Sequence, residues 1–144
     1  GVDPRQDVGR SFRLDNFKEI SKIDGIKLFS LQKINGVDQI ENKKDQFNLN
    51  IIDNLDDDAP FVDTAELISN LDLIITSDTS IAHLSGALGK KTFLLIQKYA
   101  EWRWFENRSD SPWYSNMKIF RQKIDGDWDS VFSTVKDDLV KLFK

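Results

Sequence analysis

The sequence contains no cysteine and a single histidine, and these two absences exclude several kinds of site. Without cysteine the chain can form neither a disulfide nor a thiolate metal site. The one histidine, His83, has no second histidine and no carboxylate cluster at ligand spacing, so we expect no metal and no bound cofactor. Cysteine-free chains suit a reducing compartment. We therefore expect a cytoplasmic protein.

The sequence also lacks an excess of positive charge and any long apolar run. Its formal net charge is −4 and its pI is about 5.0, which gives no electrostatic reason to expect nucleic acid or an anionic membrane as a partner. No apolar run approaches the ~20 residues of a transmembrane helix, and we expect no signal peptide before Asp3. With 144 residues, 40% hydrophobic and 31% charged, the chain is expected to be one soluble domain, residues 1–144.

Short apolar runs alternate with amphipathic segments along the whole chain. The segment 72–77 (DLIITS) is a continuous apolar run of the kind that is buried on both faces of a sheet. Such alternation predicts an α/β fold, a Rossmann-like three-layer sandwich with a mostly parallel sheet of about five strands. The expected strands are 26–31, 49–52, 72–77, 91–96 and 117–121, and the expected helices are 14–23, 37–47, 61–70, 79–88 and 128–143.

The most informative stretch is 74–89 (IITSDTSIAHLSGALG), in which an apolar strand leads straight into a helix. Asp78, Thr79 and Ser80 occupy the first turn of that helix, where unpaired backbone N–H groups and added hydroxyls can hold a phosphate. The alternative is an ordinary helix cap, because Asp, Ser and Thr cap helices in every fold of this class. Neither G-x-G-x-x-G nor a P-loop occurs, so a dehydrogenase-like dinucleotide domain is disfavoured.

Two further features admit a binding role and a packing role. His83 lies four residues after Thr79, so on a helix it could donate to a phosphate or a sugar hydroxyl. It could equally be a helix histidine packed beneath a loop. The loop 101–114 holds three of the four tryptophans, interleaved with Arg103 and Arg108. These side chains could stack on a base or sugar and pair with phosphate, or they could fill a satellite core. The acidic run 56–58 is interpreted as a solvated loop.

The sequence resembles a known family at these residues. The segment DLIITSDTSIAHLSGALGK resembles the signature of glycosyltransferase family 9, the heptosyltransferase-like enzymes of GT-B architecture. The later run EWRWFENRSDSPWYSNMKIFRQ, followed by GDWDSVF, is similar to a branch in which the transferase region occurs in bacterial proteins that carry tetratricopeptide repeats. Segments 10–11, 30–33 and 61–66 agree more loosely, so the resemblance covers nearly the whole chain.

The resemblance implies a GT-B enzyme of two Rossmann-like halves, in which the C-terminal half holds most of a nucleotide-sugar donor. This chain would be that half of an inverting, metal-independent glycosyltransferase, whose helix dipole and basic side chains take the charge of the leaving group. By position the resemblance assigns Asp78, Thr79, Ser80 and His83 to the donor diphosphate and sugar, Gln32 and Lys33 to the same cleft, Phe61, Val62, Asp63 and Thr64 to the base or ribose, and Arg10 to phosphate.

The chain also departs from the family. Residues 1–9 (GVDPRQDVG) contain no apolar strand, and the half that would supply the acceptor site and the catalytic base is absent. The chain therefore resembles a product truncated at its N-terminus. We name no catalytic residue and expect no sugar transfer by this chain alone; its partners would be the sugar donor and the missing lobe or a repeat domain. The alternative function is a non-catalytic protein-interaction module that accompanies tetratricopeptide repeats.

The absent strand leads to an expectation about the sheet. In the family this strand lies between those that match 26–31 and 72–77, and without it both would expose an unpaired backbone edge, which invites pairing. We expect the two strands to pair directly in one five-stranded sheet, or else self-association that lends a strand between chains. A six-stranded sheet with a central strand from 1–9 would contradict both.

Overall fold

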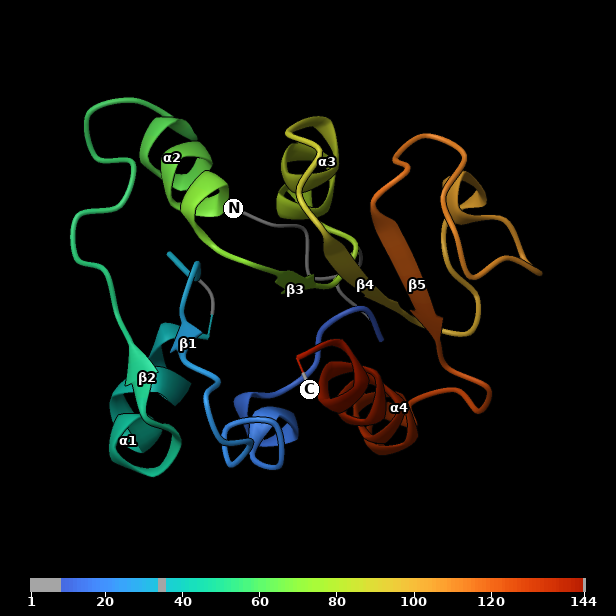
Figure 1. Cartoon of the computed structure of the whole chain (residues 1–144), viewed down its shortest axis with the longest axis horizontal. Helices are drawn as coiled ribbons and strands as arrows, with labels where there is room; N and C mark the ends of the chain where they lie inside the picture. Colours follow the sequence, from blue (N-terminus) through green and yellow to red (C-terminus); the bar gives the residue numbers. More distant parts are fainter. Residues whose placement is uncertain (1–8, 34–35, 144) are drawn as a thin grey trace.

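The structure is a computed structural model, and it describes residues 9–33 and 36–143, with the backbone alone at 44 and 45. The described residues alternate strands with helices, as the sequence predicts (Figure 1). The elements are, in chain order, the 3₁₀ turn η2 (Leu14–Phe17), β1 (Leu28–Phe29), α1 (Val37–Phe47), β2 (Leu49–Asn50), α2 (Val62–Asn70), β3 (Ile74–Thr76), α3 (Ser80–Ala87), β4 (Thr92–Ile96), the 3₁₀ turn η3 (Trp102–Trp104), β5 (Met117–Arg121) and α4 (Trp128–Leu142).

The five strands are all parallel, and they form two small sheets. The first has the order β1-β2, with Leu28 opposite Leu49, and the second has the order β3-β4-β5, with Ile74 opposite Thr92 and Thr92 opposite Met117. The predicted α/β class with parallel strands is therefore confirmed. No helix among the described residues is long and apolar enough to cross a membrane.

The second sheet is covered on both faces, which makes the molecule layered. All five residues of β4 are buried, and their side chains alternate between two clusters. Phe93 and Leu95 belong to one cluster, and Leu94 and Ile96 belong to the other. The first cluster is completed by Val131, Phe132, Val135 and Leu139 of α4, and the second by Ala82 of α3 and Trp104 of η3.

Helix α4 follows directly from its sequence pattern. Its apolar residues recur on one face, and Asp127 caps its first turn by accepting a hydrogen bond from the Ser130 amide at 3.1 Å. A hydrogen bond from the Ser130 hydroxyl, together with this one from the amide, holds the pKa of Asp127 below its usual value. Phe12, just before η2, packs edge-on against Trp128 and Phe132 of this helix.

The expected direct pairing of 26–31 with 72–77 is wrong. Among the described residues, β1 pairs with β2 alone and β3 with β4 alone, so one five-stranded sheet does not form. The physical reason is the anchoring of η2. This turn holds α1 through a hydrogen bond from the Leu14 amide to Gln39, and it holds α4 through the aromatic contacts of Phe12. The position of β1 is thereby set by α4, away from β3. The expectations on 1–9 concern residues that, except Gly9, lie outside the described part of the chain.

Four predicted elements are much shorter in the structure, among them the strand expected at 72–77, of which β3 keeps three residues. The helix expected over 14–23 is only the 3₁₀ turn Leu14–Phe17 followed by turns, in which the Ser21 hydroxyl bonds back to the Lys18 carbonyl. The strands expected at 26–31 and 49–52 shrink to two residues each. Each of these two strands has a neighbouring strand on one side only. A longer ladder would therefore add few hydrogen bonds.

Candidate functional site

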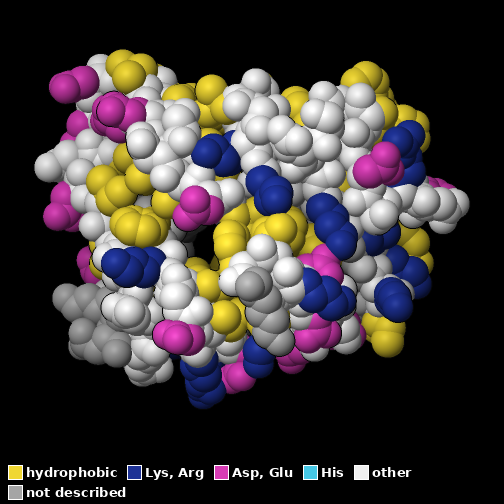
Figure 2. Space-filling view, in the orientation of Figure 1, with side chains coloured by type: hydrophobic (Ala, Val, Ile, Leu, Met, Phe, Trp, Pro, Cys, Tyr) yellow, Lys and Arg dark blue, Asp and Glu magenta, His cyan; other side chains and the backbone are white. Residues whose placement is uncertain are grey.

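A cavity of about 520 Å³ lies between the two sheets. Figure 2 shows the face hollowed at this place, with hydrophobic side chains on its walls. Every residue of β1 and of β3 lines it, together with residues around η2 and α1. The lining is formed by residues 10–14, 17, 27–32, 36, 39–40, 49, 71, 73–77, 79 and 81.

The polar residues of the cavity come mainly from the carboxyl ends of β1 and β3. Ser30 and Gln32 follow β1, and Thr76, Ser77 and Thr79 end β3 or follow it. Thr76 Oγ1 lies 3.3 Å from Thr79 Oγ1 and donates to the Ser77 carbonyl at 3.1 Å. Ligands of open α/β sheets bind outside the carboxyl ends of the strands. The cavity therefore has its hydroxyl groups at the end where such ligands bind.

The charge of the cavity is opposite to that of the chain. Its charged lining residues are Arg10, Arg13 and Lys27, and no Asp or Glu lines it, although the formal net charge of the chain is −4. No described acid lies within ion-pair distance of these three side chains. Clefts lined by charge of one sign focus the field and attract the opposite charge. This cavity is suited to an anion.

The first turn of α3 stands beside the cavity. Thr79 is its N-cap residue, with an extended backbone (φ −136°, ψ 176°), and no side chain caps the helix. From the sequence alone, an ordinary side-chain cap was the alternative. The structure shows no such hydrogen bond at this helix start. Asp78 is buried and does not line the cavity, and Ser80 is exposed outside it. Of the three residues singled out in this turn, only Thr79 reaches the cavity.

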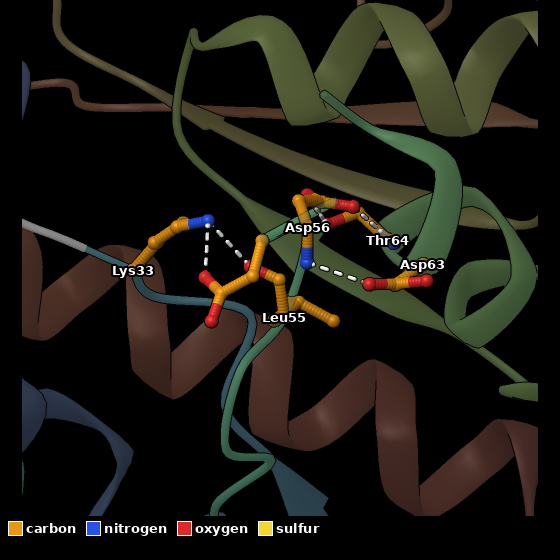
Figure 3. A network of polar contacts seen from close by, with 6 residues as sticks. Lys33, Leu55, Asp56, Asp63 and Thr64 are labelled. Carbon is orange, nitrogen blue, oxygen red and sulfur yellow. Dashed lines mark hydrogen bonds and ion pairs between the residues drawn. The ribbon is translucent and has the colours of Figure 1, made fainter. Parts of the chain in front are cut away.

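Five of the residues that the resemblance assigned lie elsewhere, around the start of α2, and Figure 3 shows three of them, Lys33, Asp63 and Thr64. Lys33 Nζ donates to the Leu55 carbonyl at 2.6 Å and lies 3.2 Å from Asp57 Oδ1. Asp63 and Thr64 instead bond to residue 56: the Asp56 amide donates to Asp63 at 2.8 Å. Phe61 and Val62, at the same helix start, are exposed. This group does not line the cavity, whereas Arg10, Gln32 and Thr79 do.

Asp56 was missed by sequence reasoning, which took 56–58 as a solvated loop. Its Oδ1 accepts from the Thr64 amide at 2.9 Å, and its Oδ2 accepts from the Thr64 hydroxyl at 2.5 Å (Figure 3). Desolvation acts to raise the pKa of Asp56, but the hydrogen bonds from Thr64 and Asp63 and the positive charge of Lys33 together lower it. Asp56 thus anchors the loop to the first turn of α2. The signal in the sequence that could have predicted this contact is an aspartate eight residues before a threonine in the first turn of the expected helix.

His83 lies against the tryptophan-rich loop and not in the cavity. Its Nδ1 is 3.0 Å from the Tyr114 hydroxyl, and its ring stacks on Trp104 with centroids 5.4 Å apart. This arrangement matches the alternative of a histidine packed beneath a loop. In the loop itself, Trp104 is fully buried in the core, which matches the packing alternative, while Trp102 and Trp113 are 72% and 56% exposed.

The described residues contain no group of three or more His, Asp and Glu side chains placed to hold a metal ion. Comparison of the chain with family models, with curated proteins and with solved structures finds no match.

Replacement of Gly86 by alanine tests the packing beneath the tryptophan-rich loop. Alanine in a helix interior is normally about 1 kcal/mol better than glycine. A Cβ at Gly86, however, would lie 2.5 Å from Tyr114 Cγ, so the ring must move and release His83. We expect Gly86→Ala to lower the stability by about 1–3 kcal/mol, measured by thermal or urea unfolding. The same change in a Tyr114→Ala background should be neutral or stabilising. A melting temperature that Gly86→Ala raises in the wild-type background would contradict this packing.

Replacement of Asp56 by asparagine tests the anchor of the α2 loop. Because the folded-state pKa of Asp56 is lowered, its carboxylate stabilises the fold above the unfolded pKa of about 3.9, and this contribution is lost as pH falls through the folded value. We expect Asp56→Asn to have a lower melting temperature than wild type at pH 7, and the difference to shrink below about pH 4. Asp58→Asn, at an exposed neighbour, is the matched control and should show no such difference. A deficit that is the same at every pH would refute the role of the carboxylate.

Proposed function

We propose that this chain binds the nucleoside diphosphate part of a sugar donor in the cavity between β1 and β3, as the donor-binding half of an inverting glycosyltransferase. One observation carries the proposal. In this acidic chain the cavity between β1 and β3 has only basic residues among its charged lining residues, and hydroxyl side chains at the carboxyl ends of both strands.

The size and the polar groups of the cavity fit such a ligand. Its volume of about 520 Å³ is in the range of small-molecule sites, which run from about 300 to 1,000 Å³. Arg10 can pair with a phosphate, and the hydroxyls of Ser30 and Thr79 can donate to phosphate or sugar oxygens. The sequence resemblance independently assigned Arg10, Gln32 and Thr79 to the donor, and these three residues line one cavity.

The chemistry proposed is direct displacement at the anomeric carbon of the sugar, with the nucleoside diphosphate as leaving group. Negative charge grows on the diphosphate as the bond breaks, and Arg10 and the positive end of α3 would stabilise it. No residue of this chain is proposed as the base that deprotonates the acceptor. Loss of a positioned base typically costs about 10²–10⁴-fold in rate, so the isolated chain is proposed to bind the donor without transferring its sugar.

A protein-interaction module is the second candidate, and it has an observation of its own. Four large aromatic side chains of the loop after β4 are exposed: Tyr99, Trp102, Phe105 and Trp113. Trp and Tyr are enriched at the centres of protein interfaces. This candidate requires no nucleotide binding, so the experiment below separates the two.

Titration of the chain with uridine diphosphate and with adenosine diphosphate, by calorimetry or NMR, tests the donor site. We expect weak binding by the wild type and a loss of about tenfold in affinity for Arg10→Gln, because a charge-assisted hydrogen bond is removed. Thr79→Val should also weaken binding. Arg108→Gln is the matched control, because Arg108 is paired with Asp110 at 2.7 Å and does not line the cavity.

The variant His83→Ala tests on which side of α3 the ligand binds. Because His83 does not line the cavity, this variant should bind as the wild type does. If His83→Ala abolishes binding and Arg10→Gln leaves it intact, the donor binds on the side of α3 that faces the tryptophan-rich loop. If the wild type binds neither diphosphate, the proposal of a donor site is wrong.

A further inference from the structure

The loop between β4 and β5 presents aromatic rings to solvent. The side chains of Tyr99, Trp102, Phe105 and Trp113 are all exposed, and none of these four residues lines the cavity. In Figure 1 the loop lies at the opposite side of the molecule from β1 and β2. The loop is therefore a surface of its own, separate from the proposed donor site.

Hydrogen bonds fix the backbone of this loop. Trp113 Nε1 donates to the Arg103 carbonyl at 3.0 Å, which ties the last tryptophan of the loop to the turn η3. The Ile119 amide of β5 donates to the Ser109 carbonyl at 2.8 Å, so the loop also covers part of the outer edge of β5. A partner strand cannot extend the sheet where the loop covers this edge. The rings are thus preorganised, which lowers the entropy cost of binding.

Phe105 has a backbone conformation that favours glycine. Its φ is 50° and its ψ is 167°, and a bulky side chain is strained at such a positive φ. Arg121 holds this conformation, because it donates to the carbonyls of Trp104, at 3.1 Å, and of Phe105. Strain of this kind persists only where the surrounding structure enforces it, and it clusters at ligand clamps and other functional sites. Here Trp104 is buried, while the ring of the next residue, Phe105, is exposed.

The charged side chains of the loop neutralise one another. Residues 98–113 contain three Lys or Arg and three Asp or Glu side chains. Arg103 lies 3.3 Å from Glu101, and Arg108 donates to both carboxylate oxygens of Asp110, at 2.9 and 2.7 Å. A surface with balanced charge steers neither an acidic nor a basic partner toward itself. Its ligand is therefore expected to be uncharged.

The hydrogen-bonding groups that remain on this surface are mainly donors. Within the part of the chain that the structure describes, neither the Trp102 indole N–H nor the Tyr99 hydroxyl has a hydrogen-bond partner. An indole N–H can only donate, and a phenol can donate. The carboxylates of Glu101 and Asp110, which could accept, are already engaged with arginines. The surface thus fits a ligand with apolar groups and carbonyl acceptors but few donors.

We propose that the loop 98–113 is a binding surface for a proline-rich segment of a partner protein in the polyproline II conformation. Proline side chains are apolar and uncharged, and proline has a backbone carbonyl but no N–H. A polyproline II helix has no internal hydrogen bonds, so its carbonyls are free to accept from Trp and Tyr. Docking of such segments on aromatic side chains is a general mode of peptide recognition. The proposal does not depend on the donor site, and it supplies the partner chemistry that the second candidate function leaves open.

The probe for this proposal is an acetylated and amidated peptide of about nine prolines, three turns of a polyproline II helix. Its control is a peptide of the same length made of alternating glycine and serine, which has the carbonyls but neither the apolar rings nor the stiffness. Tryptophan fluorescence and amide shifts in NMR spectra measure binding. We expect the proline peptide to bind, and the control peptide to bind at least about tenfold more weakly.

Two substitutions at Trp102 separate the role of its ring from that of its N–H. Trp102→Ala removes both, and we expect a loss of about tenfold or more in affinity for the proline peptide, as at the centre of other interfaces. Trp102→Phe keeps an aromatic ring and removes the donor, so its affinity should fall by about fivefold. Ile124→Ala is the matched control, because Ile124 is an exposed apolar side chain outside the loop, and it should bind as the wild type does.

Two substitutions at Phe105 test whether the fold enforces the exposure of this ring. Phe105→Gly and Phe105→Ala both remove the ring, so both should weaken binding of the proline peptide. Only glycine relieves the backbone strain, and this relief exceeds the entropy that glycine adds to the unfolded chain. We therefore expect Phe105→Gly to melt at a higher temperature than Phe105→Ala. A lower melting temperature for Phe105→Gly would contradict a loop built to present this ring.

Three binding results would overturn the proposal. One is absence of binding of the proline peptide to the wild type, and another is equal binding by the wild type and Trp102→Ala. The third is tighter binding of maltohexaose than of the proline peptide, because a neutral saccharide would then be the ligand. Titration of Trp102→Ala with the diphosphates keeps this proposal apart from the donor site. Loss of peptide binding with intact diphosphate binding concerns the loop alone.

Discussion

The edge-to-face packing of Phe12 and Phe17 on α4 connects the two halves of the molecule. Phe12 lies 5.3 Å from Trp128 and 5.1 Å from Phe132, and Phe17 lies 4.9 Å from Phe132, between ring centroids. Such aromatic contacts stabilise the folded state by more than the burial of their surface area alone would. The turn η2 that these rings hold also bonds to α1, so the smaller sheet takes its position from α4 and not from β3. The cavity exists because this anchor keeps the sheets apart.

Helix α3 separates two environments. Thr79 at its start belongs to the cavity, while His83, four residues later, belongs to the core beneath the tryptophan-rich loop. Residues four apart on a helix share a face, but Thr79 is an extended N-cap residue and does not follow the helical rule. The start of α3 therefore contributes to the cavity, while His83 packs against Trp104 and Tyr114. Trp104 is fully buried, and Arg121 donates to its carbonyl at 3.1 Å, which holds this aromatic packing in place.

The local charge of the cavity differs from the net charge because the described acidic side chains lie outside its lining. Asp15 pairs with Lys43, Glu19 with Lys22, and Asp110 with Arg108, all at distances up to 2.7 Å. These exposed pairs contribute little stability each. No described acid lines the cavity, whereas Arg10, Arg13 and Lys27 do. Net charge alone gave no indication of this basic lining.

The sequence by itself determined the elements whose pattern is local. The apolar runs of β3, β4 and β5 and the capped, amphipathic α4 were predictable, because burial on both faces or on one stripe is written into consecutive residues. Arg10 and Gln32 were named in advance through the resemblance alone, and Thr79 also through its place in the helix turn that follows an apolar strand. Only the tertiary structure decided which residues meet across long separations. Tyr114 meets His83 over 31 positions, Phe12 meets Phe132 from the other end of the chain, and Thr64 meets Asp56 across a loop. The division into two sheets depends on the same distant contacts, and no periodicity within a single segment encodes them.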